Sequence, residues 1–336
     1  MLKKFQKITM EKHKHLYHPV TIGTITLAGN LFLAPLAGFT DQAFRSLCVK
    51  EGADLTFSEM VSAEGLARKS AKTRALLTRA ENEKVFAVQL FMKDADTAIR
   101  GLPAVIDYSP DIIDINCGCP VPKVVKTGAG SALLKSPETI YQIVHALSNE
   151  TDIPITVKIR SGWDSSSINF LDTADAAYQG GAAMITLHAR TRVQGYSGTA
   201  NLEHIKTLKE ISPLPVFGSG DLFSPAAALQ MITETGVDGV MFARGAIGNP
   251  FIFSETRHLL RTGDMPPETS KKTRAAAFLN HLDESIMLKG ESAACTEMRK
   301  HAGSYIKGFP GASEIRREIV KASTREDYEQ VLSDWV

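Results

Sequence analysis

The sequence has little cysteine, and the cysteines it has are poorly spaced for a structural role. Its 336 residues include Cys48, Cys117, Cys119 and Cys295. Four cysteines are too few for a disulfide framework, and Cys117-Gly118-Cys119 lacks the two-residue spacer typical of zinc knuckles and thioredoxin-like motifs. We therefore expect a reducing compartment and no metal site, and a reactive thiol remains an open alternative.

The sequence also lacks a long apolar run. No stretch approaches the roughly 20 apolar residues that a membrane-spanning helix needs, and the apolar segment at 31–36 is soon broken by Gly38, Thr40 and Asp41. The basic start of the chain is not followed by the apolar core of a secretory signal. We interpret residues 1–19 as an N-terminal tail, and we expect a cytoplasmic protein that does not enter the membrane.

Net charge is almost absent as well. Lys and Arg number 38 against 37 for Asp and Glu, which gives a formal charge of +1. Bulk charge therefore neither indicates nor excludes a nucleic-acid partner, and an anionic ligand must be held by a local patch. A hydrophobic fraction of 43% and a charged fraction of 22% exclude a disordered or fibrous chain. The length suggests two domains, or one large α/β barrel with an appendage.

Short apolar or β-branched runs recur through the first three quarters of the chain, and a stretch of helical character follows each. They span 30–34, 55–58, 85–90, 112–116, 155–159, 183–187, 215–218 and 239–242. Ser136-Pro137 and Ser224-Pro225 are typical of helix starts, and Gly236 of a helix end. Continuous apolar runs that alternate with helices indicate buried parallel strands, so we predict a (β/α)₈ TIM barrel over residues 20–255.

After Phe253 the strand pattern stops. Helical segments are expected at 272–288, 294–307, 312–321 and 325–335, so we predict a separate all-helical domain over residues 256–336. Between Arg299 and Lys321 there are six basic residues and two acidic ones. This excess could hold a phosphate backbone, or it could be an ordinary solvated helix face.

In a TIM barrel the functional residues follow the strands, at their C-terminal ends. The loops after the seventh and eighth strands often bind a phosphate, and here they contain Gly220, Gly245, Gly248 and Arg244. Glycines let backbone N–H groups approach an anion, and Arg244 can add a charge-assisted bond. The alternative is that these glycines only make tight turns.

The fifth strand places Lys158 inside the barrel, where a buried ammonium group is costly unless it serves an anion or forms a Schiff base. It could be the amine of an aldolase, or it could face the N1 and C2 carbonyl edge of a flavin. Gln89 favours the flavin, because a carboxamide can donate to and accept from that ring. A structural salt bridge of Lys158 remains the third possibility.

Cys119 lies between Gly118 and Pro120, on a constrained turn at the expected mouth of the barrel. A protonated thiol suits a general acid that delivers one proton beside a hydride donor. Cysteines are more often small buried hydrophobes, and we place Cys48 and Cys295 in that class. His188 also stands at a strand end, where it either fills the barrel or contacts a cofactor or substrate.

Several segments together resemble the bacterial tRNA-dihydrouridine synthases, nearest the B-type subgroup, over about residues 20–325. The matching segments are 35–41 (PLAGFTD), 57–60 (FSEM), 114–120 (DINCGCP), 128–134 (GAGSALL), 157–160 (VKIR), 188–190 (HAR) and 244–246 (RGA). The resemblance implies an FMN-dependent barrel with a helical tRNA-binding domain. It also implies reduction of the C5–C6 bond of uridine with NADPH or NADH.

The resemblance further implies roles for single residues. Cys119 corresponds to the proton donor to C5, while reduced FMN gives hydride to C6. Asn116 and Arg190 are expected at the substrate base, and Arg316 and Arg317 at the tRNA backbone. The expected FMN contacts are Pro35, Leu36, Ala37, Gln89, Lys158, His188, Ser219, Gly220, Asp221, Ala243 and Arg244.

Two positions depart from the family pattern. Ser219 stands where the family usually has Asn, which leaves the backbone amides of that loop in place, and Ala189 stands where it usually has Gly. Three other functions stay open: a flavin reductase for a free pyrimidine, a Schiff-base aldolase that uses Lys158, and a non-catalytic RNA-binding module. No obligate protein partner is predicted.

Overall fold

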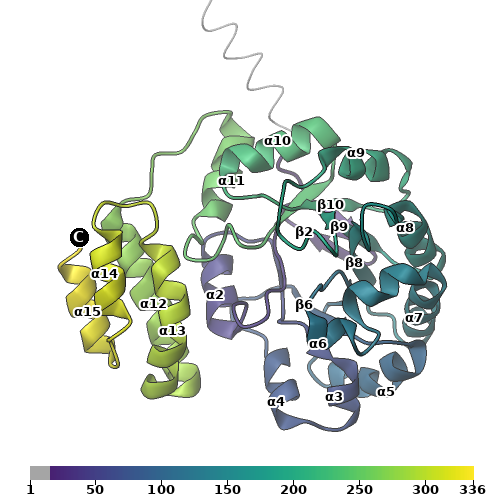
Figure 1. Ribbon diagram of the computed structural model, residues 1–336, viewed down its shortest axis with the longest axis horizontal. Helices are drawn as coiled ribbons and strands as arrows, with labels where there is room; N and C mark the ends of the chain where they lie inside the picture. The colour runs from purple at the N-terminus through teal and green to yellow at the C-terminus, as the bar shows by residue number, and fades with distance from the viewer. Residues whose placement is uncertain (1–15) are drawn as a thin grey trace, which may run out of the picture.

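In the computed structural model, which describes residues 16–336, eight parallel strands close into a barrel (Figure 1). They are β3 (Leu31–Leu33), β4 (Leu55–Phe57), β6 (Phe86–Phe91), β7 (Ile112–Cys117), β8 (Ile155–Gly162), β9 (Met184–Thr191), β10 (Val216–Ser219) and β11 (Gly239–Phe242). Each strand pairs with its neighbours, and pairing of β4 with β6 closes the ring. The predicted (β/α)₈ barrel is confirmed, with each predicted run overlapping one of these strands.

Helices surround the strands (Figure 1). They are α2 (Gln42–Lys50), α3 (Ala63–Ala67), α4 (Ala71–Arg74), α5 (Ala95–Ile106), α7 (Pro137–Glu150), α8 (Phe170–Gln179), α9 (Leu202–Ile211), α10 (Pro225–Thr235) and α11 (Ile252–Thr262). Ser224 caps α10 by accepting from the Ala227 N–H, and Gly236 ends it with a φ of 69°. Ser136 precedes α7 as expected, but its hydroxyl pairs with Thr139 Oγ1 and not with the backbone.

A hairpin seals one end of the barrel. Strands β1 (Val20–Ile22) and β2 (Ile25–Leu27) pair antiparallel and pack against the side chains inside the barrel. There, Phe32 and Phe217 stack with ring centroids 4.0 Å apart. Because the hairpin covers the end at which the strands begin, the open end is the one at which they finish. The N-terminal tail that we expected over residues 1–19 lies largely outside the described residues.

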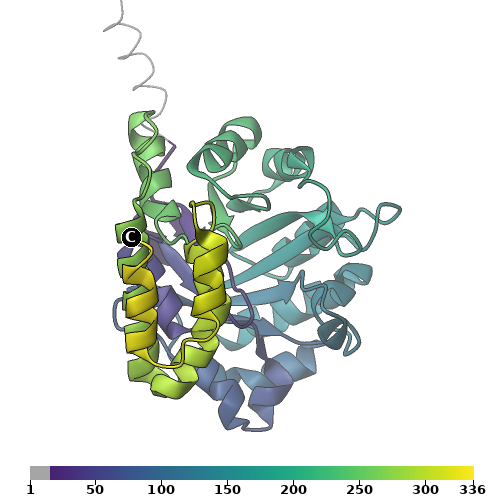
Figure 2. The same ribbon diagram turned by 60° about the vertical axis from the view of Figure 1, so that its left-hand side comes forward.

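The last four helices form a separate group beside the barrel (Figure 2). They are α12 (Lys271–Lys289), α13 (Glu291–Tyr305), α14 (Ala312–Ile319) and α15 (Arg325–Ser333). The division expected after residue 255 falls inside α11. Phe253 and Leu260 of α11 belong to the same core as the barrel strands, and a loop follows Thr262 before α12 begins. None of the helices in residues 16–336 is long and apolar enough to cross a membrane.

The helical domain rests on α2, the helix that follows the first barrel strand. Leu47 of α2 is part of the helical domain's own core. At the start of α2, Asp41 pairs with Lys289 of α12 at 2.8 Å, and Phe39 meets the ring of His301 edge-on at 5.2 Å. The position of the helical domain therefore depends on how α2 is held against the barrel.

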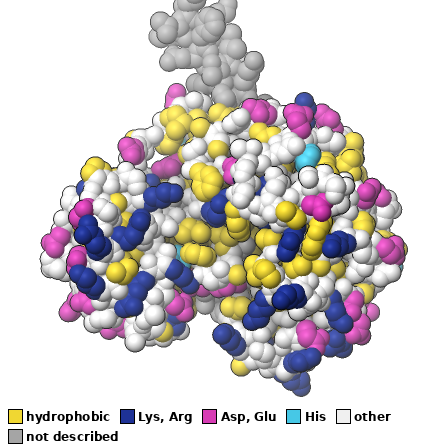
Figure 3. Space-filling view, viewed as in Figure 1, with side chains coloured by type: hydrophobic (Ala, Val, Ile, Leu, Met, Phe, Trp, Pro, Cys, Tyr) yellow, Lys and Arg dark blue, Asp and Glu magenta, His cyan; other side chains and the backbone are white. Residues whose placement is uncertain are grey.

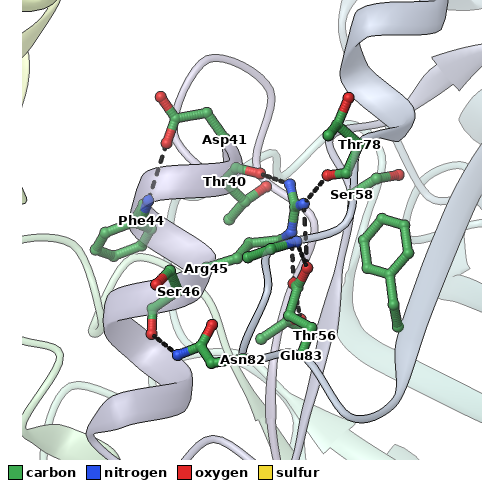
Figure 4. Close-up of polar contacts among 12 residues, drawn as sticks. Thr40, Asp41, Phe44, Arg45, Ser46, Thr56, Ser58, Thr78, Asn82 and Glu83 are labelled. Carbon is green, nitrogen blue, oxygen red and sulfur yellow. Dashed lines mark hydrogen bonds and ion pairs between the residues drawn. The ribbon is translucent and has the colours of Figure 1, made fainter. Parts of the chain in front are cut away.

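A buried ion pair holds α2 in place (Figure 4). Arg45 Nε donates to Glu83 Oε1 at 2.7 Å, and its Nη1 donates to the Thr40 carbonyl at 3.0 Å. Glu83 also accepts from Thr56 Oγ1 of β4 and from the Ala80 N–H. These contacts join α2, β4 and the segment before β6, where the short helices α3 and α4 replace one long covering helix.

Candidate functional site

A cavity of about 440 Å³ opens at the C-terminal ends of the strands. Figure 3 shows a hollow near the centre of this face, with hydrophobic side chains around it and Lys and Arg on both sides. The cavity brings together residues from every part of the barrel. The lining includes all the residues predicted to contact the flavin, together with Cys119 and Asn116.

Strand register explains why distant residues meet here. Asn116 of β7 is level with Lys158 of β8, and His188 of β9 is level with Ser219 of β10. Residues level with one another on parallel strands point to the same side of the sheet. The four side chains therefore face the same space, while the alternate residues pack against the outer helices.

Lys158 is an unpaired cation inside the barrel. Its ammonium group makes no hydrogen bond or ion pair with any residue of 16–336. Burial, and then the nearby charge of Arg160, lower its pKa to about 8. Such a group fits a ligand that brings negative charge, because burial without a partner is costly. The structural salt bridge considered for Lys158 is not present among the described residues.

The loops after β10 and β11 form the polar end of the cavity. The backbone N–H groups of Gly220, Asp221, Arg244 and Gly245 make no hydrogen bond within the described residues. Gly220 has a φ of 120° and Asp221 a φ of 54°, in the left-handed region. Free N–H groups next to an arginine form a site suited to a phosphate.

The Asp221 side chain itself is already engaged. Both carboxylate oxygens accept from Arg190 Nη2 at 2.7 Å, and one accepts from the Ala200 N–H at 2.8 Å. These hydrogen bonds, with the charge of Arg190, outweigh desolvation and lower the pKa of the Asp221 carboxyl group. Asp221 can therefore meet an anion only through its backbone, while its carboxylate orders the neighbouring arginines.

Cys119 is held on a tightly tied turn. The N–H groups of Gly118 and Cys119 donate to Asn116 Oδ1 at 3.1 and 2.9 Å. The Gly118 carbonyl accepts from Arg160 Nε at 2.7 Å and from Ser131 Oγ at 2.8 Å. Burial raises the pKa of the Cys119 thiol above its ordinary range. The thiol is therefore protonated at neutral pH and can serve as an acid.

The imidazole of His188 is neutral for a related reason. It is buried, and Lys158, Arg160, Arg190 and Arg244 all lie near it, so its pKa falls well below the usual value. Its Nε2 lies 3.4 Å from Arg190 Nη1. A neutral ring can accept or donate one hydrogen bond without adding charge to an already positive site.

Arg190, in contrast, does not line the cavity. Its side chain is only 1% exposed and is held by Asp221 and by the carbonyls of Ser197 and Gly198. In this structure it supports Asp221 at the polar end of the cavity and does not reach the place expected for a substrate base. Ala189 is buried among the outer helices, so its extra methyl group does not narrow the cavity.

Arg316 and Arg317 lie on α14, away from the cavity. Arg317 is exposed and 3.4 Å from Glu314, and Arg316 donates to the Gly303 carbonyl at 3.2 Å. Lys300, from the same basic stretch, lies 5.6 Å from the ring of Phe39 at the edge of the cavity. The basic residues thus extend from the helical domain to the mouth of the barrel.

Three residues of the site were not singled out from the sequence: Asp114, Ser131 and Tyr196. Arg160 stands with Lys158 at the end of the fifth strand, but no role was predicted for it from the sequence. Strand alternation could have pointed to Asp114, two residues before Asn116. Tyr196, 53% exposed at the rim, lies 4.4 Å from the Arg244 guanidinium. It follows no strand directly, so the sequence carried no local signal for it.

Comparison with known proteins points to one family. The model of the family described as "Dihydrouridine synthase (Dus)" matches residues 32–335. A probable tRNA-dihydrouridine synthase of Treponema pallidum is 42% identical over 337 aligned positions, which cover 97% of this chain and 98% of that protein. The tRNA-dihydrouridine synthase B of Pseudomonas putida is 39% identical and covers 88% of each chain.

Solved structures support the fold alone. A 2-naphthoyl-CoA reductase has a TM-score of 0.59 at 10% identity and covers 96% of this chain and 70% of its own. An old yellow enzyme homologue from Zymomonas mobilis has a TM-score of 0.51 at 11% identity, with coverage of 77% and 96%. The barrel architecture is therefore shared with these proteins.

Proposed function

The chain belongs to the dihydrouridine synthase family, and from this premise we propose a flavin-dependent reduction of uridine in tRNA as its reaction. It is a tRNA-dihydrouridine synthase. The proposed mechanism rests on one observation: a protonated thiol and an unpaired ammonium group lie in the same cavity. Cys119 and Lys158 both line that cavity, beside a set of free backbone N–H groups.

A flavin mononucleotide suits the residues present. The N–H groups after β10 and β11, with Arg244, would hold its single phosphate, and the 35–37 backbone would lie along the ring. Gln89 and Lys158 would meet the pyrimidine edge, where a carboxamide and a cation are complementary to ring carbonyls and to developing negative charge. We propose NADPH or NADH as the reductant on the strength of the family resemblance.

When bound, the reduced flavin supplies the hydride that adds to C6 of the uracil ring. Cys119 then delivers the thiol proton to C5, so one C–H bond forms at each carbon and the double bond is lost. The thiolate regains a proton from solvent. Asn116 holds the turn of Cys119 through its side-chain carbonyl, which places the thiol at a fixed point above the cavity.

The substrate must leave its base stack to reach this cavity, which lies at the end of a barrel. Unstacking costs a few kcal/mol, and contacts to the tRNA backbone must offset it. The basic residues between Lys300 at the cavity edge and Arg317 on α14 are suited to that role. We therefore assign tRNA binding to the helical domain together with the rim of the barrel.

The direct test is anaerobic incubation of the purified protein with FMN, NADPH and unmodified tRNA, followed by nucleoside analysis. Dihydrouridine is the expected product. Flavin binding without product from any tRNA would instead favour the reduction of a free pyrimidine. Failure to bind flavin would contradict the assignment of the strand-end residues.

The charge of Lys158 predicts a pH dependence. Its pKa is lowered to about 8, so the ammonium group is positive below that pH and neutral above it. Stabilisation of the reduced ring is therefore present at pH 7 and is lost as the pH rises through 8. We expect kcat/KM for NADPH, measured as anaerobic loss of flavin absorbance, to fall above pH 8.

The matched variant is Lys158→Met, which is unbranched and one atom shorter than lysine and removes the charge. Its rate should be low, and this alkaline limb should be absent. A wild-type profile that is flat through pH 8, or a Met variant that keeps the same limb, would contradict the role given to Lys158.

A double substitution tests the basic surface of the helical domain. Arg316→Ala with Arg317→Ala should weaken tRNA binding about tenfold, taking roughly 0.7 kcal/mol for each exposed charge. The slope of log K against log salt should become shallower by about 1–2. Flavin reduction by NADPH should be unchanged, since neither residue lines the cavity.

The matched control removes two exposed arginines from the far side of the barrel, Arg68→Ala with Arg100→Ala, which are paired with acids on α3 and α5. It changes the net charge equally. Equal tRNA affinities and salt slopes in the two double variants would refute the assignment of Arg316 and Arg317.

A further inference from the structure

Asp114 is a buried carboxylate that the proposed mechanism does not use. It lies on β7, level with Gln89 of β6 and with Thr156 of β8. It is fully buried, and it does not line the cavity, because Asn116 and Lys158 stand between it and the open space. Its hydrogen bonds therefore act on other side chains and not on a ligand.

Those hydrogen bonds form one continuous chain that ends at the turn of Cys119. Gln89 Nε2 donates to Asp114 Oδ2 at 2.7 Å, and Gln89 Oε1 accepts from Asn116 Nδ2 at 2.7 Å. Asn116 Oδ1 then accepts from the N–H groups of Gly118 and Cys119. Thr156 Oγ1 donates to the other carboxylate oxygen, at 2.6 Å.

The direction of this chain follows from the chemistry of its ends. An ionised carboxylate only accepts hydrogen bonds, so the NH₂ group of Gln89 must face Asp114. The carbonyl of Gln89 then faces Asn116, which must present its NH₂ group there and its own carbonyl to the backbone N–H groups. A flipped Gln89 would set its carbonyl oxygen against a carboxylate oxygen of Asp114 and its NH₂ group against the NH₂ group of Asn116.

We propose that Asp114 is a positioning residue, which fixes the amide orientation of Gln89 and, through Asn116, the turn that carries Cys119. The inference rests on the proposed function only in taking Cys119 as the proton donor. It links a residue at the flavin edge to the acid by hydrogen bonds, so the geometry of the two is set together.

The test separates loss of the acceptor from loss of the charge. Asp114→Val removes the acceptor and leaves the buried Gln89 Nε2 unpaired. Gln89 can then move away from Asn116, whose Nδ2 loses its partner and whose hold on the turn weakens. Asp114→Asn keeps a carbonyl for Gln89 and presents its NH₂ group to Thr156 Oγ1, which can accept as well as donate. Because the N–H groups of Gly118 and Cys119 still select the orientation of Asn116, the Asn variant should preserve the whole chain.

The matched structural control is Thr156→Val, which removes a hydrogen bond from the same carboxylate in the same layer of the barrel but leaves Gln89 and Asn116 paired. Burial raises the pKa of the Asp114 carboxyl group to about 6, so activity is measured at pH 7.5, where the group is ionised, as the reoxidation of the pre-reduced holoenzyme by tRNA. We expect Asp114→Val to lose about 10²-fold, as for a misplaced catalytic group. Asp114→Asn and Thr156→Val should stay within about threefold of the wild type.

A second measurement does not depend on turnover. Cys48, Cys117 and Cys295 are buried, so reaction of the folded holoenzyme with a chromogenic thiol reagent reports Cys119. The reaction should be faster in Asp114→Val and unchanged in Asp114→Asn and Thr156→Val. Equal effects of Asp114→Val and Thr156→Val on both measurements would overturn the proposal, because the role would then be structural.

Should the Val variant fail to fold, Asp114→Ala replaces it, because alanine also removes the acceptor of Gln89. Wild-type activity and thiol reactivity in Asp114→Ala, or a large change of either in Asp114→Asn, would overturn the proposal. Failure of the proposed function would give a different result. If Cys119→Ala were active, Cys119 would not be the proton donor. The thiol reactivity of the Asp114 variants would still show whether Asp114 holds the turn.

Discussion

Cys119→Ala is expected to lower the rate of dihydrouridine formation about 10²–10⁴-fold, the range supplied by a positioned general acid. The Cys119 thiol lines the cavity and carries a proton at neutral pH. Burial raises its pKa, so it stays protonated, whereas the nearby His188 is held neutral and Arg160 is engaged by three backbone carbonyls. Alanine leaves the turn in place and removes only the proton.

Two measurements check this expectation. Flavin reduction by NADPH should proceed at close to the wild-type rate, because it needs no proton from Cys119, while reoxidation of the reduced enzyme by tRNA should be slow. Cys117→Ala is the matched control: Cys117 is buried between the barrel and its helices and faces away from the cavity, so its loss should leave tRNA reduction nearly unchanged.

The outcome also decides which group protonates C5. Normal dihydrouridine formation in Cys119→Ala would show that another group, or solvent, protonates C5. The family assignment does not depend on this result, because it rests on the match over residues 32–335.

Much of the barrel could be predicted because buried parallel strands leave a simple pattern in the sequence. Both faces of such a strand are covered, so the run at 85–90 is apolar at every position but Gln89, and Lys158 is the one charged residue in the run at 155–159. Lys158 and Gln89 were noticed for that reason. The sequence also predicts that Lys158 and Gln89 lie at the same end of the barrel, because all its strands finish there.

The features that could not be predicted depend on pairing between distant segments. Whether Arg190 meets a substrate or an acid depends on where Asp221 lies, and the two are 31 residues apart. The expected domain boundary falls inside α11, because the helical pattern alone does not show that the helix after the last strand packs against the barrel. The choice among the roles of Lys158 likewise needed the cavity and the family, since a buried lysine suits several chemistries.

Arg45→Leu is the substitution with the largest expected effect on stability. It leaves Glu83 as a buried carboxylate whose remaining partners are Thr56 Oγ1 and the Ala80 N–H, and loss of one member of a buried ion pair costs about 3–5 kcal/mol. Arg45→Leu with Glu83→Leu should recover part of that loss, since no uncompensated charge remains. Arg68→Leu, which breaks an exposed pair, should cost at most about 1 kcal/mol. Denaturant unfolding measures all three.

The same change should also weaken flavin binding, because Arg45 Nη1 holds the Thr40 carbonyl at the end of the loop that begins with the cavity residues Pro35, Leu36 and Ala37. Leu147→Ala in α7 is the control for the loss of stability itself. Leu147 is fully buried and far from that loop, and its truncation should cost about 2–5 kcal/mol, a similar loss of stability. If the ion pair positions the loop, flavin affinity falls in Arg45→Leu and stays unchanged in Leu147→Ala. Equal affinities in the two variants would mean that Arg45 stabilises the barrel without shaping its cavity.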